Sequence, residues 1–399
     1  MMRGLSLLVC GVVAGWTVPA SHSVSLRPGH VGLAASRASP KAMLATQISR
    51  DAPAPTGPDP YKLVYEELEF IKASLKKVLT SKGKGSTGAL TSNEVLTMAA
   101  REFMQRKGKS FRPMLVLLIG RATDPDFVTD ARHSKLAVIA EMMHTASLIH
   151  ADVLEEHVTD TTQGTLVHQE VALDVGNKVC ILAGDFLLAK AAVELSLLES
   201  SKVTEIVASG LESICEGGMM GFNSTSKSAE MEALTLELHL DIVSHTTAQL
   251  VANACQSSAI LSGHDSASKV ARACQAYGEK LTMARQLITE AQAMEALLRS
   301  CRRNPKKFSA LQPRSTPFLL AAQQYPELRV LLASPNSPAL KAETAIGLLE
   351  RSGAVEATQD RAEAYAQQAA DSLNLLPSSD ARDALQLLCH KVISRTPLK

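Results

Sequence analysis

Three carboxylates, Asp152, Glu155 and Glu156, stand close together at the end of a long segment with helical periodicity, residues 131–156. Side chains three and four residues apart share one face of a helix, so all three would point the same way. Carboxylate oxygens are the ligands that Mg²⁺ prefers. The pattern therefore leaves two interpretations open, a solvated acidic cluster and a weak metal site.

The elements that must position these residues are helices. The aromatic content is only 4% of 399 residues, and the β-branched runs are short, which favours packed helices over sheets. In residues 131–156 the apolar positions cover more than one stripe, so we expect a central helix. Gly184 is expected to let two helices approach closely. The apolar positions of the central helix are Leu136, Ile139, Met143, Ala146, Leu148 and Ile149.

The sequence thus predicts an all-α protein, a single-domain helical bundle around a central cavity. A chain of this length with 46% hydrophobic residues can bury a full core. The periodicity predicts helices over residues 61–79, 94–106, 113–121, 131–156, 177–199, 203–215, 230–261 and 267–300.

The first 60 residues differ from the rest in composition. An apolar run at residues 5–18 is too short to span a bilayer, and residues 21–50 are rich in Ser, Ala and Arg. This is typical of a leader for mitochondrial import or, alternatively, of a bipartite leader for a plastid. Four prolines between residues 53 and 60 then predict a stiff linker. We expect a leader and linker over residues 1–60 and a folded domain over 61–399.

Charge and cysteine content exclude other classes. Residues 1–50 hold five basic and no acidic residues, so the remainder carries 36 basic and 40 acidic side chains. This balance, without a basic stripe, excludes a nucleic-acid-binding protein. The seven cysteines form no CxxC pair, which indicates buried thiols in a reducing compartment.

Four stretches in the same order resemble the trans-isoprenyl (polyprenyl) diphosphate synthases. Residues 108–113, GKSFRP, are similar to that family's GKxxRP. Residues 143–156 resemble LHxxSLIHDDVxDD, and residues 176–190 resemble GNKxAVLAGDFLLA. Residues 277–290 look like YGxxLGxAFQLxDD, the entry to the second Asp-rich motif. The resemblance implies the family's all-α fold and its condensation of an allylic diphosphate with isopentenyl diphosphate, in which Mg²⁺ neutralises the departing diphosphate.

The departures from these patterns concern the metal motifs. Ala151 replaces the leading Asp of the first motif, and only Glu290 remains as a carboxylate in the second, Thr289 to Ala293. The arginine pair after the first motif falls at Thr162-Gln163, and Thr246-Thr247 stands for the later Lys-Thr pair. A single carboxylate cannot reproduce the second metal site. By the resemblance, Asp152, Glu155, Glu156 and Glu290 are vestigial metal ligands.

The retained residues are the basic ones. The resemblance assigns Lys109, Arg112 and His144 to isopentenyl diphosphate. Alternatively, Arg112 and His144 are hydrogen-bonded scaffold groups and Lys109 is a surface cation.

Loss of the acidic motif residues together with retention of the basic ones implies a non-catalytic subunit, similar to the second subunits of decaprenyl diphosphate synthases. The expected partner is a catalytic polyprenyl diphosphate synthase subunit in a heterodimer or heterotetramer, with Mg²⁺ on that partner, isoprenyl diphosphates as ligands and a quinone side chain as the end use. The alternatives are a divergent active synthase and a stand-alone isoprenyl diphosphate-binding protein. The basic run in residues 302–307 is an exposed loop or a peripheral contact with an anionic membrane surface.

Overall fold

The prediction of an all-α protein is confirmed. The computed structural model describes residues 47–80, 110–124, 131–156, 177–223, 234–304, 308, 311–333 and 338–394, and these contain helices and no strand. Ala45–Lys399 forms one compact unit. The expected helix over residues 94–106 lies outside the described residues. No helix in the described ranges is long and apolar enough to cross a membrane.

The helix bounds agree closely with the periodicity of the sequence. The helix predicted over residues 131–156 is α5, and the segment predicted as one helix over 230–261 is interrupted by a π-helical turn, η1. In chain order the helices are α1 (Pro60–Leu63), α2 (Tyr65–Thr80), α4 (Phe111–Thr123), α5 (Ala131–Glu156), α7 (Asn177–Ser196), α8 (Ser201–Asn223), α9 (Leu236–Val243), η1 (Ser244–Ala248), α10 (Gln249–Leu261), α11 (Lys269–Arg303), α12 (Thr316–Gln324), α13 (Glu327–Ala333), α14 (Pro338–Arg351), α15 (Ala354–Ser372), η3 (Leu373–Leu375) and α16 (Asp380–Ile393).

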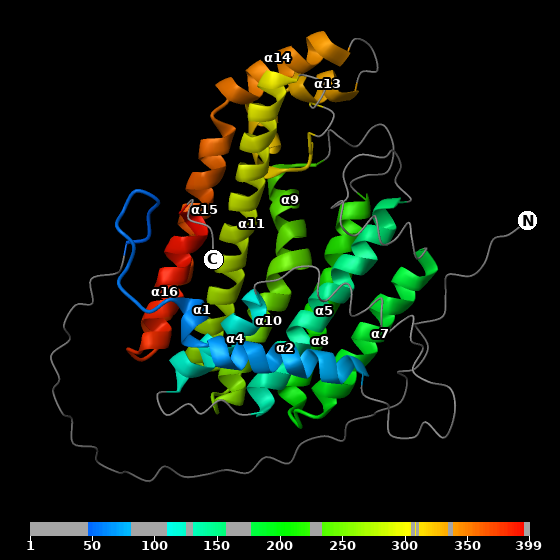
Figure 1. The fold of residues 1–399 in the computed structure, drawn as a ribbon. Helices are drawn as coiled ribbons and strands as arrows, with labels where there is room; N and C mark the ends of the chain where they lie inside the picture. The colour runs from blue at the N-terminus through cyan, green and yellow to red at the C-terminus, as the bar shows by residue number, and fades with distance from the viewer. Residues whose placement is uncertain are drawn as a thin grey trace, which may run out of the picture. The chain divides into compact units, whose positions relative to one another are not determined.

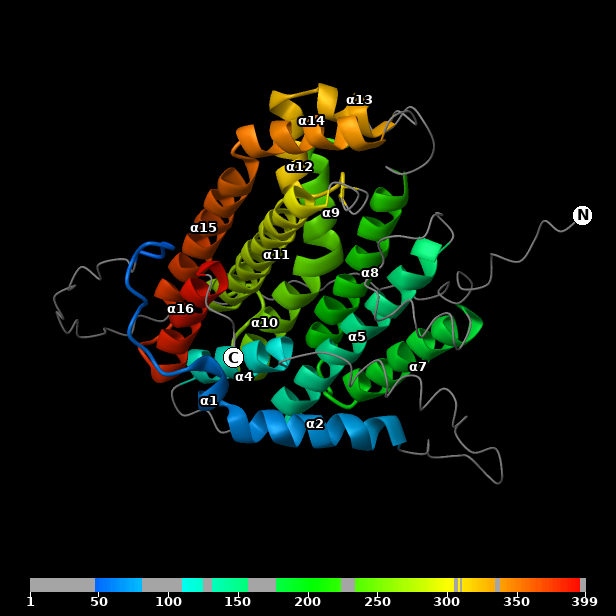
Figure 2. The same cartoon turned by 45° about the horizontal axis from the view of Figure 1, so that its top comes forward.

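The bundle has two hydrophobic clusters. The larger one surrounds α4 and α10, which are buried over most of their length, and α5 and α11 pack against it. The smaller cluster joins the end of α11 to α12, α13 and α14. In Figures 1 and 2, α11 and α15 run side by side, α13 and α14 lie at one end, and α2 crosses the opposite end. α11 therefore links both clusters.

Most of the core positions predicted on α5 are buried. Leu136 and Ile139 have no exposed surface, and Met143, Ala146 and Ile149 are also buried. Leu148 is the exception, because 41% of its surface is exposed. The periodicity located the buried face of α5 correctly but wrongly included Leu148 in it.

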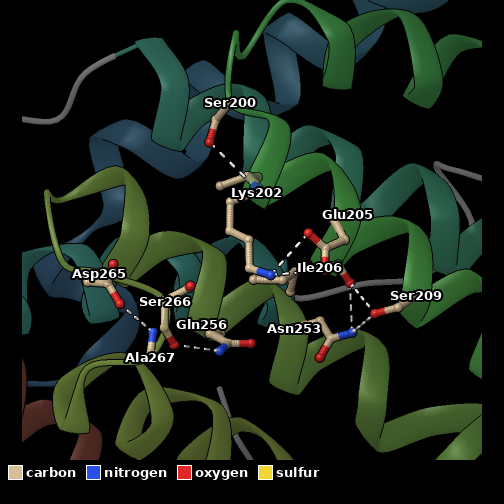
Figure 3. A network of polar contacts seen from close by, with 11 residues as sticks. Ser200, Lys202, Glu205, Ile206, Ser209, Asn253, Gln256, Asp265, Ser266 and Ala267 are labelled. Carbon is tan, nitrogen blue, oxygen red and sulfur yellow. Dashed lines mark hydrogen bonds and ion pairs between the residues drawn. The ribbon is translucent and has the colours of Figure 1, made fainter. Parts of the chain in front are cut away.

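A buried polar network joins α8 to α10. The Asn253 amide donates hydrogen bonds to the Ile206 carbonyl (2.8 Å) and the Ser209 hydroxyl (3.2 Å), as Figure 3 shows. Nearby, the Gln256 amide donates to the Ser266 carbonyl in the turn before α11 (3.3 Å). Asn253 and Gln256 are both buried, so these bonds satisfy groups that water cannot reach. The network fixes the position of α8 against the core.

Residues 47–59 form an N-terminal strap across α15 and α16. Ile48 is buried, and its amide donates to the Gln367 side chain (2.6 Å). Arg50 forms ion pairs with Asp360 and Glu363 of α15. The compact unit begins at Ala45, so the prolines between residues 53 and 60 lie within it. They give an extended backbone that packs on the domain.

The strap is also tied to α16. The His390 side chain contacts the Ala52 carbonyl (3.1 Å), and Asp59 forms an ion pair with Lys391. At Gly57 a Cβ atom would lie 2.9 Å from the Asp383 carbonyl oxygen, so only glycine fits this approach to the helix backbone. The strap thus joins segments more than 300 residues apart in the sequence.

Candidate functional site

Arg112 lies in the first turn of α4 and faces Glu141 of α5. The guanidinium Nη1 is 3.7 Å from the Glu141 Oε2 atom, and the two side chains are 13% and 14% exposed. Burial lowers the Arg112 pKa to about 10, and attraction to Glu141 opposes this shift. Arg112 therefore stays charged at neutral pH. Yet Arg112 Nε and Glu141 Oε2 are buried without a hydrogen-bond partner in the described structure.

Arg285 of α11 also lies beside the start of α4, near Arg112 and Glu141. Its guanidinium carbon lies 4.3 Å from the centre of the Phe111 ring, in a cation–π contact. Tyr61 of α1 is the fourth group close enough to interact with these charges, and burial raises its pKa to about 12, so its hydroxyl is neutral. Four helices, α1, α4, α5 and α11, thus converge on two arginines and one carboxylate. Arg112, Glu141, Arg285, Phe111 and Tyr61 are called the arginine cluster below.

The two other residues that the resemblance assigns to diphosphate binding are His144 and Lys109. His144 lies on α5, one turn after Glu141 and on the same face, and is half-buried. Lys109 precedes the described part of α4 and lies outside the described residues.

Glu290 occupies the second acidic motif and is engaged within the bundle. It is 8% exposed, and its carboxylate accepts hydrogen bonds from the Thr316 backbone amide (2.8 Å) and the Gln286 side chain (3.0 Å). His239 Nε2 of α9 is 3.3 Å from both carboxylate oxygens. Burial alone would raise the pKa of Glu290, but the bonds from His239 and Thr316 outweigh it and lower the pKa. Glu290 therefore joins α9, α11 and the start of α12.

The first acidic motif ends α5. The helix continues to Glu156, which keeps Asp152, Glu155 and Glu156 at the predicted helical spacing, but these side chains lie outside the described part. Among the described residues, no three Asp, Glu, His or Cys side chains form a group that could hold a metal ion. At the second motif the residues do not fit Mg²⁺, since Glu290 already accepts from several donors and has no second carboxylate beside it.

The contact between α5 and α7 next to the first motif is very close. A Cβ atom on Gly184 would lie 2.2 Å from His150 Nε2, so the expected close approach of two helices is confirmed. The neighbouring Asp185 pairs with the same imidazole (3.5 Å). His150 also contacts the Ile181 carbonyl (3.2 Å).

Two other departures from the family pattern replace basic residues, at Thr246-Thr247 and at Thr162-Gln163. Thr246 and Thr247 lie in the π-helical turn η1, where the Thr246 hydroxyl donates to the Ile242 carbonyl (2.7 Å). Gly217 of α8 packs against this turn, since a Cβ atom there would lie 2.6 Å from the Cβ of His245. Thr162 and Gln163 lie outside the described residues. The Lys-Thr position has thus become part of a tight helix contact.

Glu141, Arg285 and His239 are among the residues of these sites that sequence reasoning missed. Glu141 could have been found because it precedes His144 by three positions on one helical face. Arg285 stands where the quoted pattern AFQ has its phenylalanine, so the motif itself contained the signal. His239 lies 51 residues from Glu290, and no local pattern predicts their contact.

Comparisons with known proteins agree with this fold and these motifs. The polyprenyl synthetase family model matches residues 93–290. A decaprenyl-diphosphate synthase of Dictyostelium discoideum is 30% identical over 345 residues, covering 85% of this chain and 72% of that protein. The mitochondrial solanesyl-diphosphate synthase 1 of Oryza sativa is 29% identical over 360 residues, covering 85% of this chain and 79% of that protein.

Among solved structures, a polyprenyl synthase from Caulobacter crescentus, complexed with calcium and isoprenyl diphosphate, superposes with a TM-score of 0.67. It is 25% identical and covers 86% of this chain and 99% of that one. The family match, the identity to relatives over more than two thirds of their length and the shared fold lead to one conclusion. The chain belongs to the polyprenyl synthetase family.

Proposed function

We propose that this chain is the non-catalytic subunit of a heteromeric all-trans polyprenyl diphosphate synthase. The observation that carries the proposal is the engagement of Glu290, whose carboxylate pairs with His239 and accepts from the Thr316 amide. Using it as a metal ligand would leave a buried amide and a buried imidazole without their acceptor, which costs free energy for each group. The second metal motif therefore serves the fold of this chain.

The remaining chemistry is assigned to a related catalytic subunit. When Mg²⁺ is bound with the substrate, it neutralises the charge of the departing diphosphate. We place that ion on the partner. This chain contributes a bundle of the same fold, with Arg112 retained and the acidic motifs reduced. Its role is to complete the assembly and to shape the cavity into which the product grows.

An apolar stripe on α7 is the surface that we assign to the partner. Four exposed apolar residues of α7, and a fifth directly after the helix, follow one another at spacings of one, seven, four and four residues, so they lie along one side of the helix over about 24 Å. Among the positions of this face whose burial the structure describes, the exposed charged residue is Asp185, which pairs with His150. A long face with so little charge is typical of an obligate interface. The stripe consists of Ile181, Leu182, Ala189, Val193 and Leu197.

The stripe can be tested with a matched pair of valines. Val193→Glu would place a charge in the interface and should abolish co-purification with the catalytic chain. Val330→Glu on α13 is the control, because Val330 is also an exposed helical valine but lies outside the stripe. Equal co-purification of both variants with the catalytic chain would show that α7 is not the docking surface.

Activity tests the function itself. We would purify the chain lacking residues 1–46, alone and co-expressed with a catalytic polyprenyl synthase from the same source, and follow Mg²⁺-dependent condensation of isopentenyl diphosphate with an allylic primer. We expect no turnover by the chain alone and, in the mixture, a product length or rate that the partner alone does not give. Turnover by the isolated chain would instead identify a divergent active synthase.

We further propose a mitochondrial location and a quinone side chain as the end use of the product. The leader-like composition of residues 1–46 and the mitochondrial relative support this location. A fluorescent fusion of the full chain that co-localises with a plastid marker would contradict it.

A further inference from the structure

Arg285 replaces an aromatic residue of the family pattern with a cation. In the segment Ala284-Arg285-Gln286 the pattern AFQ would place phenylalanine at residue 285. The chain has also lost the arginine pair that follows the first acidic motif, where it has Thr162 and Gln163. One arginine has thus appeared in a chain that lacks two others.

The stacking of Arg285 leaves its hydrogen-bonding edge available. The guanidinium lies over Phe111, at 4.3 Å from the ring centre, so its flat face is covered. All five N–H groups of a guanidinium lie in its plane and point away from a ring stacked on that face. Among the described residues, none accepts a hydrogen bond from the Arg285 guanidinium or forms an ion pair with it within 4 Å. The side chain is exposed, so its donors face solvent and are open to a ligand.

The charges around Arg285 do not balance. Tyr61 is neutral, so the arginine cluster holds the two positive charges of Arg112 and Arg285 against the single negative charge of Glu141. That carboxylate is 3.7 Å from Arg112, longer than a charge-assisted hydrogen bond, and the buried Nε atom of Arg112 has no acceptor. An anion would restore neutrality and supply acceptors for Arg112 Nε and for the donors of Arg285.

The start of α4 adds to this preference for an anion. Ser110 caps the helix in a left-handed conformation (φ 50°) without a side-chain hydrogen bond. The first amide groups of α4 are thus not satisfied by a capping side chain, and the positive end of the helix dipole lies beside Phe111 and Arg112. Helix starts of this kind bind phosphate groups well when cations are near.

From this geometry we infer that Arg285 is a diphosphate-binding residue of this chain, which acts with Arg112 as a pair of guanidinium groups. The inference rests on the proposed function for the ligand class, an isoprenyl diphosphate. It adds a cation that the family pattern does not contain. Arg285 would bind the phosphate groups and not the hydrocarbon part that a phenylalanine would contact.

Titration calorimetry of the full chain with inorganic pyrophosphate and with isopentenyl diphosphate tests this assignment. Arg285→Ala should weaken the binding of both ligands by about tenfold or more, because each charge-assisted hydrogen bond contributes that order of affinity. Arg285→Lys should keep part of the affinity, since the charge remains but the fork of donors is lost. Circular dichroism of each variant verifies that the fold is retained.

Two further variants make the result specific. Arg299→Ala removes another exposed arginine of α11 and should leave both affinities unchanged. Arg285→Phe restores the family residue and should bind pyrophosphate as poorly as Arg285→Ala. If Arg285→Phe instead binds isopentenyl diphosphate more tightly and pyrophosphate as the wild type does, Arg285 faces the hydrocarbon and the inference is overturned.

The proposed function and the role of Arg285 can fail independently of each other. If the Arg285→Ala chain binds both ligands like the wild type but still changes the product of the catalytic chain, the inference is wrong and the subunit proposal stands. If the wild-type chain binds neither ligand at millimolar concentration, the inference is also overturned. A tenfold loss in Arg285→Ala supports the inference even where the co-expressed chains show no combined activity.

Discussion

Replacing Glu290 by alanine should destabilise the protein strongly. The change would leave the Thr316 amide without its acceptor at 2.8 Å and the imidazole of His239 without its acceptor at 3.3 Å. Each buried group that loses its partner costs about 1–3 kcal/mol, and breaking a buried pair costs about 3–5 kcal/mol in total. Gln286 is half-buried and can turn to water. We therefore expect the free energy of unfolding to fall by about 3–5 kcal/mol.

Urea denaturation followed by circular dichroism measures this loss. Glu290→Gln should lose less, about 1–2 kcal/mol, because one amide oxygen can still accept from Thr316. Gln292→Ala, two residues later on the exposed side of α11, is the control and should change the free energy by less than about 0.5 kcal/mol. If Glu290→Ala unfolds at the same urea concentration as the control, the carboxylate does not hold these helices together.

The contribution of Glu290 to the free energy of unfolding should decrease in acid. The pKa of Glu290 is lowered in the folded protein, so the carboxylate binds fewer protons folded than unfolded. Its contribution to stability is present above its unfolded pKa, near 4.5, and is lost as the pH falls through the lower folded value. The difference in unfolding free energy between the wild type and Glu290→Gln should thus be constant at neutral pH and shrink below about pH 4.5. A difference that grows in acid would contradict this account.

The other predictions concern two close contacts of the bundle. Gly184→Ala should destabilise the protein by about 1–3 kcal/mol in thermal or urea unfolding, because its Cβ would meet the ring of His150, and adding His150→Ala should recover part of the loss. Removing residues 1–60 should give a less stable protein than removing residues 1–46, because only the longer deletion takes away the N-terminal strap, and equal melting temperatures would show that the strap is dispensable. Arg50→Ala should account for about 1 kcal/mol of that difference, since its ion pair with Glu363 is partly exposed to solvent.

The sequence predicted well whatever depends on neighbours along the chain. The bounds of α5 and most of its buried positions followed from helical periodicity, and the close approach at Gly184 followed from an isolated glycine in an apolar helix. Leu148 was placed in the core because periodicity defines the direction of a side chain but not the width of the buried face. Its exposure depends on which helices pack against α5, which is a tertiary property.

Contacts between distant segments were not predictable in the same way. The strap was interpreted as a linker because four prolines between residues 53 and 60 prevent helix formation. An extended segment can still pack on a domain when it carries suitable side chains. Here the decisive ones are Ile48 and Arg50, and their partners on α15 are over 300 residues away. Composition alone contains no information on such a pairing.

Glu290 and Arg285 lie five residues apart on α11 but are engaged in different ways. Glu290 accepts hydrogen bonds from buried donors, whereas the guanidinium of Arg285 stacks on Phe111 and is exposed. A metal site requires several carboxylates at once, so a single remaining carboxylate gains more from hydrogen bonds within the fold. A diphosphate site needs only clustered cations and amides, which a single substitution can strengthen. Under the proposed function, loss of metal binding and retention of an anion site would therefore be independent changes, and an anion site could persist in a subunit that performs no catalysis.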